Sequence, residues 1–194
     1  GAGVVFGPGS AAVSLLTERS APVPGAPAIS VAVPVLNGGA RLVELVRAVL
    51  DQIVGAGPVE ILLADSGSTD GAVQVAVSRS PAVRVFDVAT GRFDHGLVRT
   101  GLVQAARAPL VALLSQDAVP RGQRYLEALA APFAHPDVAG ATARQVPRPG
   151  ADALVRAALD AWTPPPGARP FLVRRLPPGA AGLAPAERMR LARH

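Results

Sequence analysis

The sequence predicts an α/β protein whose mostly parallel sheet is flanked by helices and followed by an irregular arm rich in proline and arginine. Two observations support this prediction. From Ile29 onwards, short apolar runs alternate with segments whose apolar residues recur at helical spacing. After Pro149 this regularity ends and proline becomes frequent. Strands that alternate with helices call for parallel pairing, because each helix carries the chain back across the sheet.

Three regions follow from the same pattern. Residues 1–28 are rich in glycine, alanine and proline, and we expect them to form a flexible leader with one short helix near residues 11–18. Residues 29–149 carry the regular alternation and form the α/β domain. Residues 150–194 form the Pro/Arg-rich arm.

The elements of the domain are predicted from apolar runs for strands and from a period of about 3.6 residues for helices. The predicted strands span residues 29–35, 59–64, 83–88, 109–114 and 138–143. The predicted helices span residues 40–54, 69–79, 95–106 and 121–133, with shorter helices at 152–161 and 185–193. Ser68 would cap the second helix, and Asp70 would place a negative charge in its first turn.

The composition excludes several kinds of chemistry. The chain has no cysteine, so disulfides, thiolate nucleophiles and cysteine-based metal sites are absent. No apolar run is long enough for a transmembrane helix. All 19 basic residues are arginine, as a GC-rich genome would favour, and many of them follow Arg144. This basic arm suits phosphate or an anionic membrane surface, whereas the lack of interleaved aromatic residues argues against nucleic acid as a partner.

Asp65 is the residue around which a candidate site can be placed. It directly follows the apolar run at residues 61–64, so it stands at the carboxyl end of a central strand, where ligands bind in open α/β sheets. A carboxylate in that position needs a ligand, a cation or a hydrogen-bond donor. Taken alone, Asp65 is equally well explained as a cap of its own loop.

Polar residues also follow the other predicted strands. Asn37 follows the first, His95 and Arg99 follow the third, and Gln116 and Asp117 follow the fourth. Carboxylates, an amide, an imidazole and a guanidinium that converge on one sheet edge suit a nucleoside diphosphate with a divalent metal. The chain has neither a Gly-x-x-x-x-Gly-Lys loop nor a Gly-x-Ser-x-Gly elbow, which argues against a P-loop ATPase and a serine hydrolase.

Five motifs that contain these residues occur in order along the chain. They are Pro34-Val-Leu-Asn37, Asp65-Ser-Gly-Ser-Thr-Asp-Gly71, Phe93-Asp-His-Gly96 with Arg99, Ser115-Gln-Asp-Ala118 and Arg144-Gln-Val-Pro-Arg148. At this spacing, the stretch from Ile29 to Arg148 resembles a family 2 glycosyltransferase of the Rossmann-like GT-A fold, specifically its bacterial rhamnosyltransferase-like branch. Each motif is weak alone, and five in register are a strong signal.

The resemblance implies roles for these residues. Asp65 would contact the base, Arg99 would face the diphosphate, and Asp117 would be the ligand of a Mg²⁺ or Mn²⁺ ion. His95 would either hold its loop or contact the substrate. The remaining implied contacts are with the nucleotide for Pro34, Leu36, Asn37 and Ser66, with the ribose or sugar for Gln116, and with the donor sugar or the acceptor for Arg144 and Gln145.

The resemblance also implies a reaction. A sugar would be transferred, with inversion, from a nucleotide-diphosphate sugar donor to a bacterial envelope glycan or to a lipid-linked acceptor. Such an enzyme would work in the cytoplasm. A peripheral contact with the inner face of the cytoplasmic membrane would suit the basic arm.

Two departures from the family pattern bear on this reaction. The branch reads Thr-Arg-Asn after His-Gly, whereas this chain has Val98-Arg99-Thr100 and so lacks an amide that would order the diphosphate loop. Inverting members also carry a general-base carboxylate on a later segment, and Asp152, Asp160 and Glu187 match no such motif. We therefore expect the general base to lie outside this chain, with residues 150–194 beginning an incomplete acceptor-side region of a protein truncated at its C-terminus.

Two other functions remain open at this point. A degenerate member of the family would bind nucleotide without catalysing transfer. A sugar nucleotidyltransferase has the same type of sheet and needs a Gly-rich loop with a basic residue soon after the first strand, for which Asn37-Gly-Gly-Ala-Arg41 is a weak match.

Overall fold

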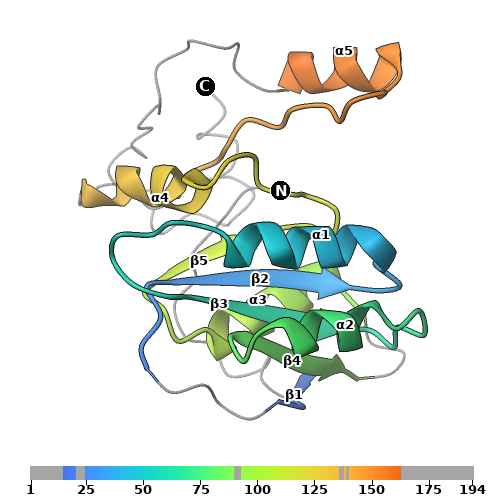
Figure 1. Cartoon of the computed structure of the whole chain (residues 1–194), viewed down its shortest axis with the longest axis vertical. Helices are drawn as coiled ribbons and strands as arrows, with labels where there is room; N and C mark the ends of the chain where they lie inside the picture. The colour runs from blue at the N-terminus through green and yellow to red at the C-terminus, as the bar shows by residue number, and fades with distance from the viewer. Residues whose placement is uncertain (1–14, 21–24, 90–92, 136–137, 139, 163–194) are drawn as a thin grey trace, which may run out of the picture. The chain divides into compact units, whose positions relative to one another are not determined.

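The chain forms two compact units in a computed structural model that describes residues 15–20, 25–89, 93–135, 138 and 140–162 (Figure 1). Of the described residues, the first unit takes those up to 131 together with 140–142, and the second unit takes the others. The first unit contains the sheet and therefore the strand ends after which Asn37, Asp65 and Asp117 lie.

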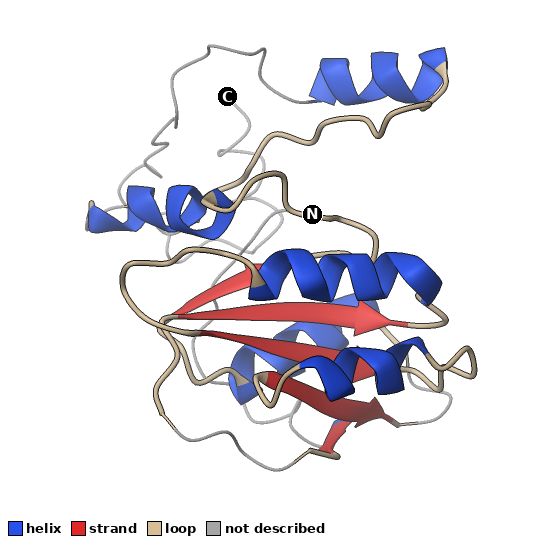
Figure 2. Cartoon of the chain, in the orientation of Figure 1, coloured by secondary structure: helices blue, strands red, loops and turns tan. Residues whose placement is uncertain are grey.

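The first unit is built on a five-stranded sheet in the order β1-β4-β3-β2-β5. The strands from β2 to β5 pair in parallel, as predicted, and β1 pairs antiparallel with β4. In Figure 2 the arrowheads of β2, β3 and β4 point the same way, so their carboxyl ends meet at one edge, here called the carboxyl edge. The strands are β1 (Leu16–Glu18), β2 (Ile29–Val35), β3 (Val59–Asp65), β4 (Val83–Val88) and β5 (Leu110–Leu113).

Helices cover both faces of this sheet, so the central strands are buried on both sides. One face, with Val33, packs against α1 and α2, and the other face, with Ala32, packs against Val98 and Leu102 of α3 (Figure 1). Leu126 of α4 is buried in the first of these cores. The helices of this unit are α1 (Gly39–Leu50), α2 (Ala72–Arg79), α3 (His95–Ala105) and α4 (Tyr125–Ala130).

The order of the strands reverses between β2 and β5. β3 and β4 are added on one side of β2, whereas β5 returns to its other side. The pairing of β5 with β2 ends where Ala32 lies opposite Leu113, and the carbonyl of Ala32 accepts a hydrogen bond from the N–H of Leu114 at 3.0 Å. Pro34 has no N–H with which to continue this ladder. Ligands of open α/β sheets bind at such a reversal, outside the carboxyl ends of the strands.

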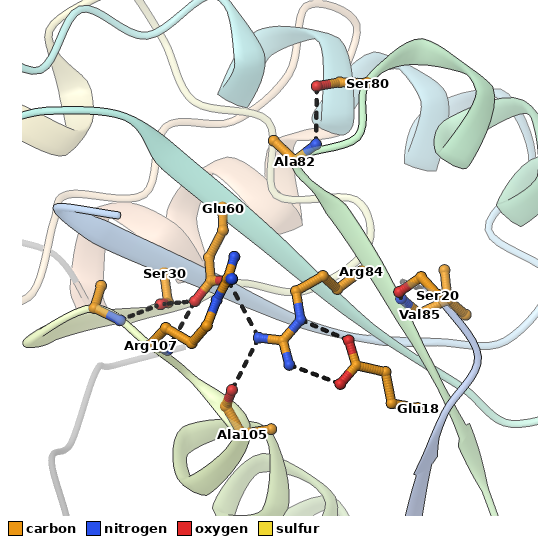
Figure 3. Close-up of polar contacts among 11 residues, drawn as sticks. Glu18, Ser20, Ser30, Glu60, Ser80, Ala82, Arg84, Val85, Ala105 and Arg107 are labelled. Atoms are coloured by element: carbon orange, nitrogen blue, oxygen red, sulfur yellow. Dashed lines mark hydrogen bonds and ion pairs between the residues drawn. The ribbon is translucent and has the colours of Figure 1, made fainter. Parts of the chain in front are cut away.

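The opposite edge of the sheet holds a buried network of charges (Figure 3). Glu60, 2% exposed, accepts hydrogen bonds from Ser30 Oγ at 2.6 Å, Arg107 N at 2.8 Å and Arg84 Nη1 at 3.2 Å. Arg84 also donates to both carboxylate oxygens of Glu18, at 2.7 and 2.9 Å. Burial raises the pKa of Glu60, but hydrogen bonds from Ser30 and Arg107 and the charge of Arg84 outweigh burial and hold this pKa below its usual value. The network joins four strands to the segment that follows α3.

Two predicted elements are wrong. Instead of the helix expected near residues 11–18, Leu16–Glu18 form the edge strand β1, whose Glu18 is held by Arg84 of β4. A tertiary ion pair thus outweighs the local preference of this short segment for a helix. The strand expected at residues 138–143 is also absent, since residues 138 and 140–143 have no regular structure. Gly140 and its small neighbours favour a strand only weakly.

α2 begins later than the sequence predicted because Ser68 does not cap it. The hydroxyl of Ser68 accepts a hydrogen bond from Asn37 N at 3.0 Å. The N-cap position is taken by Gly71, whose φ of 75° lies in the left-handed region that favours glycine. Asp70 accepts a hydrogen bond from Ala72 N at 3.1 Å. Asp70 therefore lies just before α2 and not in its first turn, where it was predicted.

The second unit contains α5 (Ala153–Trp162), close to the helix expected at residues 152–161. The side chain of Asp152 accepts a hydrogen bond from Val155 N at 2.8 Å, as an N-cap does. The helix expected at 121–133 is shortened to α4 and followed by a 3-10 turn over Ala131–Ala134. The basic helix expected at 185–193 lies outside the described residues. None of the helices in the described ranges is long and apolar enough to cross a bilayer.

Candidate functional site

Gln116 joins the exits of β2 and β5 at the point where the strand order reverses. Its Oε1 accepts a hydrogen bond from Leu36 N at 2.9 Å, and its Nε2 donates to Leu36 O at 3.2 Å. An amide can do both because it has an acceptor and a donor in one plane. The two bonds continue the link between β2 and β5 beyond Pro34. The amide that was predicted to lie near the ribose or sugar is thus engaged at both ends with Leu36.

The loop after β3 holds the loop after β2 from the other side. Asn37 Oδ1 accepts a hydrogen bond from Thr69 N at 2.9 Å, in addition to the bond from its own N–H to Ser68. Gly39 N donates to Asp70 Oδ2 at 2.7 Å. Asn37 has a φ of 49°, a left-handed conformation that asparagine tolerates better than most residues. The loop that carries Leu36 and Asn37 is therefore fixed from both β3 and β5.

Asp65, only 4% exposed at the end of β3, has partners that compensate for its burial. Its Oδ1 accepts a hydrogen bond from Ser68 N at 2.8 Å, and its Oδ2 accepts one from Arg19 Nη2 at 2.9 Å. The same Nη2 lies 2.6 Å from Oδ1 of Asp87, which stands beside Asp65 in the sheet register. Burial raises the pKa of Asp65, but hydrogen bonds from Ser68 and Arg19 and the charge of Arg19 outweigh burial and lower this pKa. Asp65 thus caps its own loop and remains a charged acceptor at the carboxyl edge.

Two of the predicted contact residues each have a buried polar atom without a partner. Ser66 Oγ and Arg99 Nε make no hydrogen bond to any residue within the described ranges. Buried polar atoms in proteins are almost always paired with protein or water. An unpaired hydroxyl and an unpaired guanidinium nitrogen are therefore groups that a polar ligand can satisfy.

His95 begins α3, the helix that also carries Arg99. The side chain of Asp94 caps this helix, and the ring of His95 packs edge-on against Phe93 with 4.7 Å between the centroids. This contact suits the alternative in which His95 holds its loop. In the part of the chain that the structure describes, no hydrogen bond or ion pair links His95 or Arg99 to the network around Asp65.

Asp117 lies in the turn after β5 and is the carboxylate predicted to hold a metal. Its side chain is 54% exposed, and its Oδ2 is 4.0 Å from Nη1 of Arg41 on α1. Within the described residues, no cluster of three or more potential metal ligands occurs. A single carboxylate nevertheless fits Mg²⁺, which commonly takes one or two protein carboxylates and completes its coordination with phosphate and water. Asp117 therefore fits a metal that a bound diphosphate would also hold.

Arg144 and Gln145 belong to the second unit. Arg144 Nη2 is 3.2 Å from Oδ1 of Asp160 on α5. The predicted contact of Arg144 and Gln145 with the sugar or the acceptor stays a prediction. Glu187, one of the acids without a matching base motif, lies outside the described residues.

Sequence reasoning missed Arg19 and Asp87. Arg19 stands in the region predicted to be a flexible leader, and Asp87 stands inside a predicted strand. One signal was available, because Glu18 and Arg19 are the only charged residues in the first 28 positions. Two adjacent charges in an otherwise uncharged segment indicate specific partners. In the structure, Glu18 pairs with Arg84 and Arg19 pairs with Asp65.

Comparisons with known proteins found a matching family, a curated relative and similar solved structures. The sequence matches the family described as glycosyl transferase family 2 over residues 30–192. It is 27% identical over 127 residues to the O-antigen chain rhamnosyltransferase RfbN of Salmonella typhimurium (strain LT2), which is 65% of this chain and 40% of that protein. Among solved structures, the mannosyltransferase PcManGT from Pyrobaculum calidifontis, in complex with GDP-Man and Mn2+, is similar with a TM-score of 0.50 and 24% identity, over 63% of this chain and 37% of that one. TarS of S. aureus in complex with UDP-GlcNAc gives a TM-score of 0.47 and 24% identity, over 53% and 30% of the two chains.

The likeness to PcManGT concerns the fold, a mostly parallel sheet flanked by helices that has the GT-A arrangement. This chain spans less than half the length of RfbN and of PcManGT. The family match, in contrast, covers most of the chain and includes all five motifs that follow the predicted strands. This chain belongs to glycosyl transferase family 2.

Proposed function

We propose that this chain binds a nucleotide-diphosphate sugar with a divalent metal and takes part in transferring the sugar to an acceptor. The observation that carries the proposal is the hydrogen-bonded convergence of the exits of β2, β3 and β5 at the reversal of strand order, in a family 2 glycosyltransferase. Asp65, an ionised carboxylate, ends β3, and Asp117, an exposed carboxylate, follows β5. These two strands lie on either side of β2, which leads into the fixed loop of Asn37.

Each of these groups suits one part of a nucleotide sugar. Asp65 is a charged acceptor for an N–H group of the base. The hydroxyl of Ser66 and the Nε of Arg99 supply the polar groups that the described residues leave unpaired, and the guanidinium suits the negative diphosphate. Pro34 and Leu36 would border the nucleotide from the exit of β2, with Gln116 acting through its bonds to Leu36.

Asp117 would hold Mg²⁺ or Mn²⁺ beside the diphosphate. When bound there, the metal would stabilise the negative charge that develops on the leaving diphosphate. Arg99 would add to that stabilisation from α3. Transfer with inversion proceeds by direct attack of an acceptor hydroxyl, for which a general base is needed. Asp160 is paired with Arg144 and Asp152 caps α5, so we assign the base to neither of them.

The donor and acceptor classes are proposed from the relatives. RfbN is named as a rhamnosyltransferase of an O-antigen chain, and PcManGT was solved with GDP-Man and Mn2+. We propose a hexosyl or rhamnosyl donor for this chain and an envelope glycan or lipid-linked acceptor. Transfer to such an acceptor would take place in the cytoplasm at the inner face of the membrane, where the basic arm would contact anionic lipid.

Replacing Asp117 by alanine tests the proposal. Calorimetry with UDP, thymidine diphosphate and GDP in the presence of Mn²⁺ should show binding to the wild-type chain and its loss in Asp117→Ala, because the metal would lose its protein ligand. Omitting Mn²⁺ should weaken binding to the wild-type chain and change little in the variant.

Asp51→Ala is the matched control. Asp51 is a carboxylate of similar exposure, 60%, at the far end of α1, and its pair with Arg47 is long at 3.9 Å. This variant should bind nucleotide as the wild type does. If Asp117→Ala keeps its full Mn²⁺-dependent affinity, the metal assignment is wrong. If the wild-type chain binds none of the three nucleotides, the donor site itself is wrong.

A further inference from the structure

Arg19 offers unused hydrogen-bond donors at the carboxyl edge. Its Nη2 serves both Asp65 and Asp87, whereas its Nη1 and Nε make no hydrogen bond to any residue that the structure describes. The side chain is 42% exposed, so a ligand can reach it. A guanidinium carries five N–H donors in a planar fork, and an ion pair made through one nitrogen leaves the others for a ligand.

β1 fixes Arg19 in this position. The N–H of Arg19 donates to Val85 O at 2.7 Å, and the preceding residue, Glu18, is bound to Arg84 through both carboxylate oxygens. Neighbouring residues of an extended chain point to opposite faces, so the anchoring of Glu18 on one face directs Arg19 to the other. The guanidinium is therefore held before any ligand binds, and little conformational entropy would be lost when it contacts one.

A carboxylate beside a guanidinium is complementary to a ring N–H beside a ring carbonyl. Uracil, thymine and guanine present this edge, and their ring N–H groups are more acidic than the amino groups of cytosine and adenine. An acidic donor makes the stronger hydrogen bond to an ionised carboxylate such as Asp65. In cytosine and adenine an amino group takes the place of the carbonyl oxygen. The amino N–H would then face the N–H groups of Arg19, and both sets of donors would be left without an acceptor.

Building on the proposed function, we propose that Arg19 and Asp65 together read the base of the donor nucleotide. Arg19 donates to a ring carbonyl oxygen while Asp65 accepts from the adjacent ring N–H, which selects uracil, thymine or guanine over cytosine and adenine. Arg19 directly follows β1 and precedes residues 30–192, which match the family, so this contact comes from a residue outside the family match.

Nucleotide affinities with Mn²⁺ test the inference on the full chain. Calorimetry should show that the wild type binds UDP, thymidine diphosphate and GDP about tenfold or more tightly than CDP and ADP, the loss expected for an unpaired polar group. Arg19→Ala should lower the affinity for UDP about tenfold and leave that for CDP nearly unchanged, so the preference should shrink to the part that Asp65 alone provides. Arg19→Lys keeps one charged donor and should retain part of it.

Pyrophosphate with Mn²⁺ separates base reading from a structural role, because it has no base. Its affinity should be the same in Arg19→Ala and wild type. An equal loss for UDP, CDP and pyrophosphate, or an unchanged UDP preference in Arg19→Ala, would overturn the inference. Arg47→Ala, on the outer surface of α1, is the control and should alter no affinity. If Arg19→Ala does not fold, Arg19→Gln takes its place in the same test. Failure of the wild type to bind any nucleotide would refute the proposed function instead.

Discussion

Gln116 shows why the identity of a single side chain matters at the carboxyl edge. Its amide meets both the N–H and the carbonyl of Leu36, so it substitutes for a stretch of main-chain pairing that β2 and β5 no longer make. A carboxylate in this position could accept from Leu36 N but could not donate to Leu36 O. The residue that resembles a ligand contact in the sequence therefore acts, in the structure, on the loop that precedes α1.

Gln116→Glu should weaken nucleotide binding by loosening this loop. We expect a loss of about 1 kcal/mol of stability, because one hydrogen bond is replaced by the repulsion of two oxygens. We also expect a fall of about tenfold in nucleotide affinity, which corresponds to about 1.4 kcal/mol. Urea denaturation and calorimetry with Mn²⁺ measure the two effects separately.

The matched control is Gln52→Glu. Gln52 also bridges two segments through its amide, donating to Gly122 O at 2.8 Å and accepting from Leu126 N at 3.1 Å, and it lies just beyond the C-terminal end of α1. Its Nε2 also donates to Ala48 O at 3.0 Å, so this change should cost at least as much stability and leave nucleotide affinity unaltered. An equal loss of affinity in both variants would show that Gln116 has no special effect on the site.

At the scale of elements, the Glu60 network explains how a strand as short as β1 is held. The three residues of β1 pair with β4, and Glu18 accepts two further hydrogen bonds from Arg84. Arg84 in turn donates to Glu60 and to Ala105 O, at the end of α3. The same network therefore fixes β1 and the end of the helix that carries Arg99.

Glu60→Gln should destabilise the fold by about 3 kcal/mol or more, because it leaves Arg84 and Arg107 without their buried counter-charge. Thermal and urea denaturation measure this loss. The control is Arg124→Ala, which breaks an ion pair of 2.6 Å with Glu127. The side chain of Arg124 is 72% exposed. This substitution should cost less than about 1 kcal/mol, since exposed pairs are screened by solvent. Similar losses in the two variants would contradict a special role for the buried network.

At the scale of the whole molecule, stability should depend on pH on the acid side. The pKa values of Glu18, Glu60 and Asp65 are all lowered in the folded state. A lowered pKa stabilises the fold above the pKa of the unfolded chain, about 4, and this stabilisation is lost as the pH falls through the folded value. Urea denaturation from pH 7 down to pH 3 should therefore show a nearly constant free energy of unfolding above about pH 5 and a steep fall below about pH 4.

Glu60→Gln should make this acid-side fall shallower, because one of the three groups no longer takes up a proton on unfolding in acid. A free energy of unfolding that stays constant or rises on acidification would contradict the assignment of these shifts.

Sequence reasoning predicted the α/β architecture and the parallel strands from β2 to β5, because their apolar runs and helical segments are strongly periodic. It failed where contacts distant in sequence decide the conformation. The hydroxyl of Ser68 pairs with Asn37 and not with its own helix, and Glu18 forms a strand through Arg84. No local pattern shows that Arg19 reaches Asp65, which is 46 residues away in sequence.

β1 also closes one side of the sheet. The family match begins at residue 30, so a recombinant domain cut at that boundary would lack this strand. β4 would then present a row of unpaired N–H and C=O groups, which is the usual template for strand-to-strand association between molecules. The in-register carboxylates of Asp65 and Asp87 would lose their shared cation, and Arg84 would lose Glu18. By covering the edge of β4, β1 would reduce strand-to-strand association between molecules. Glu18 and Arg19 meanwhile supply the counter-charges of Arg84, Asp65 and Asp87.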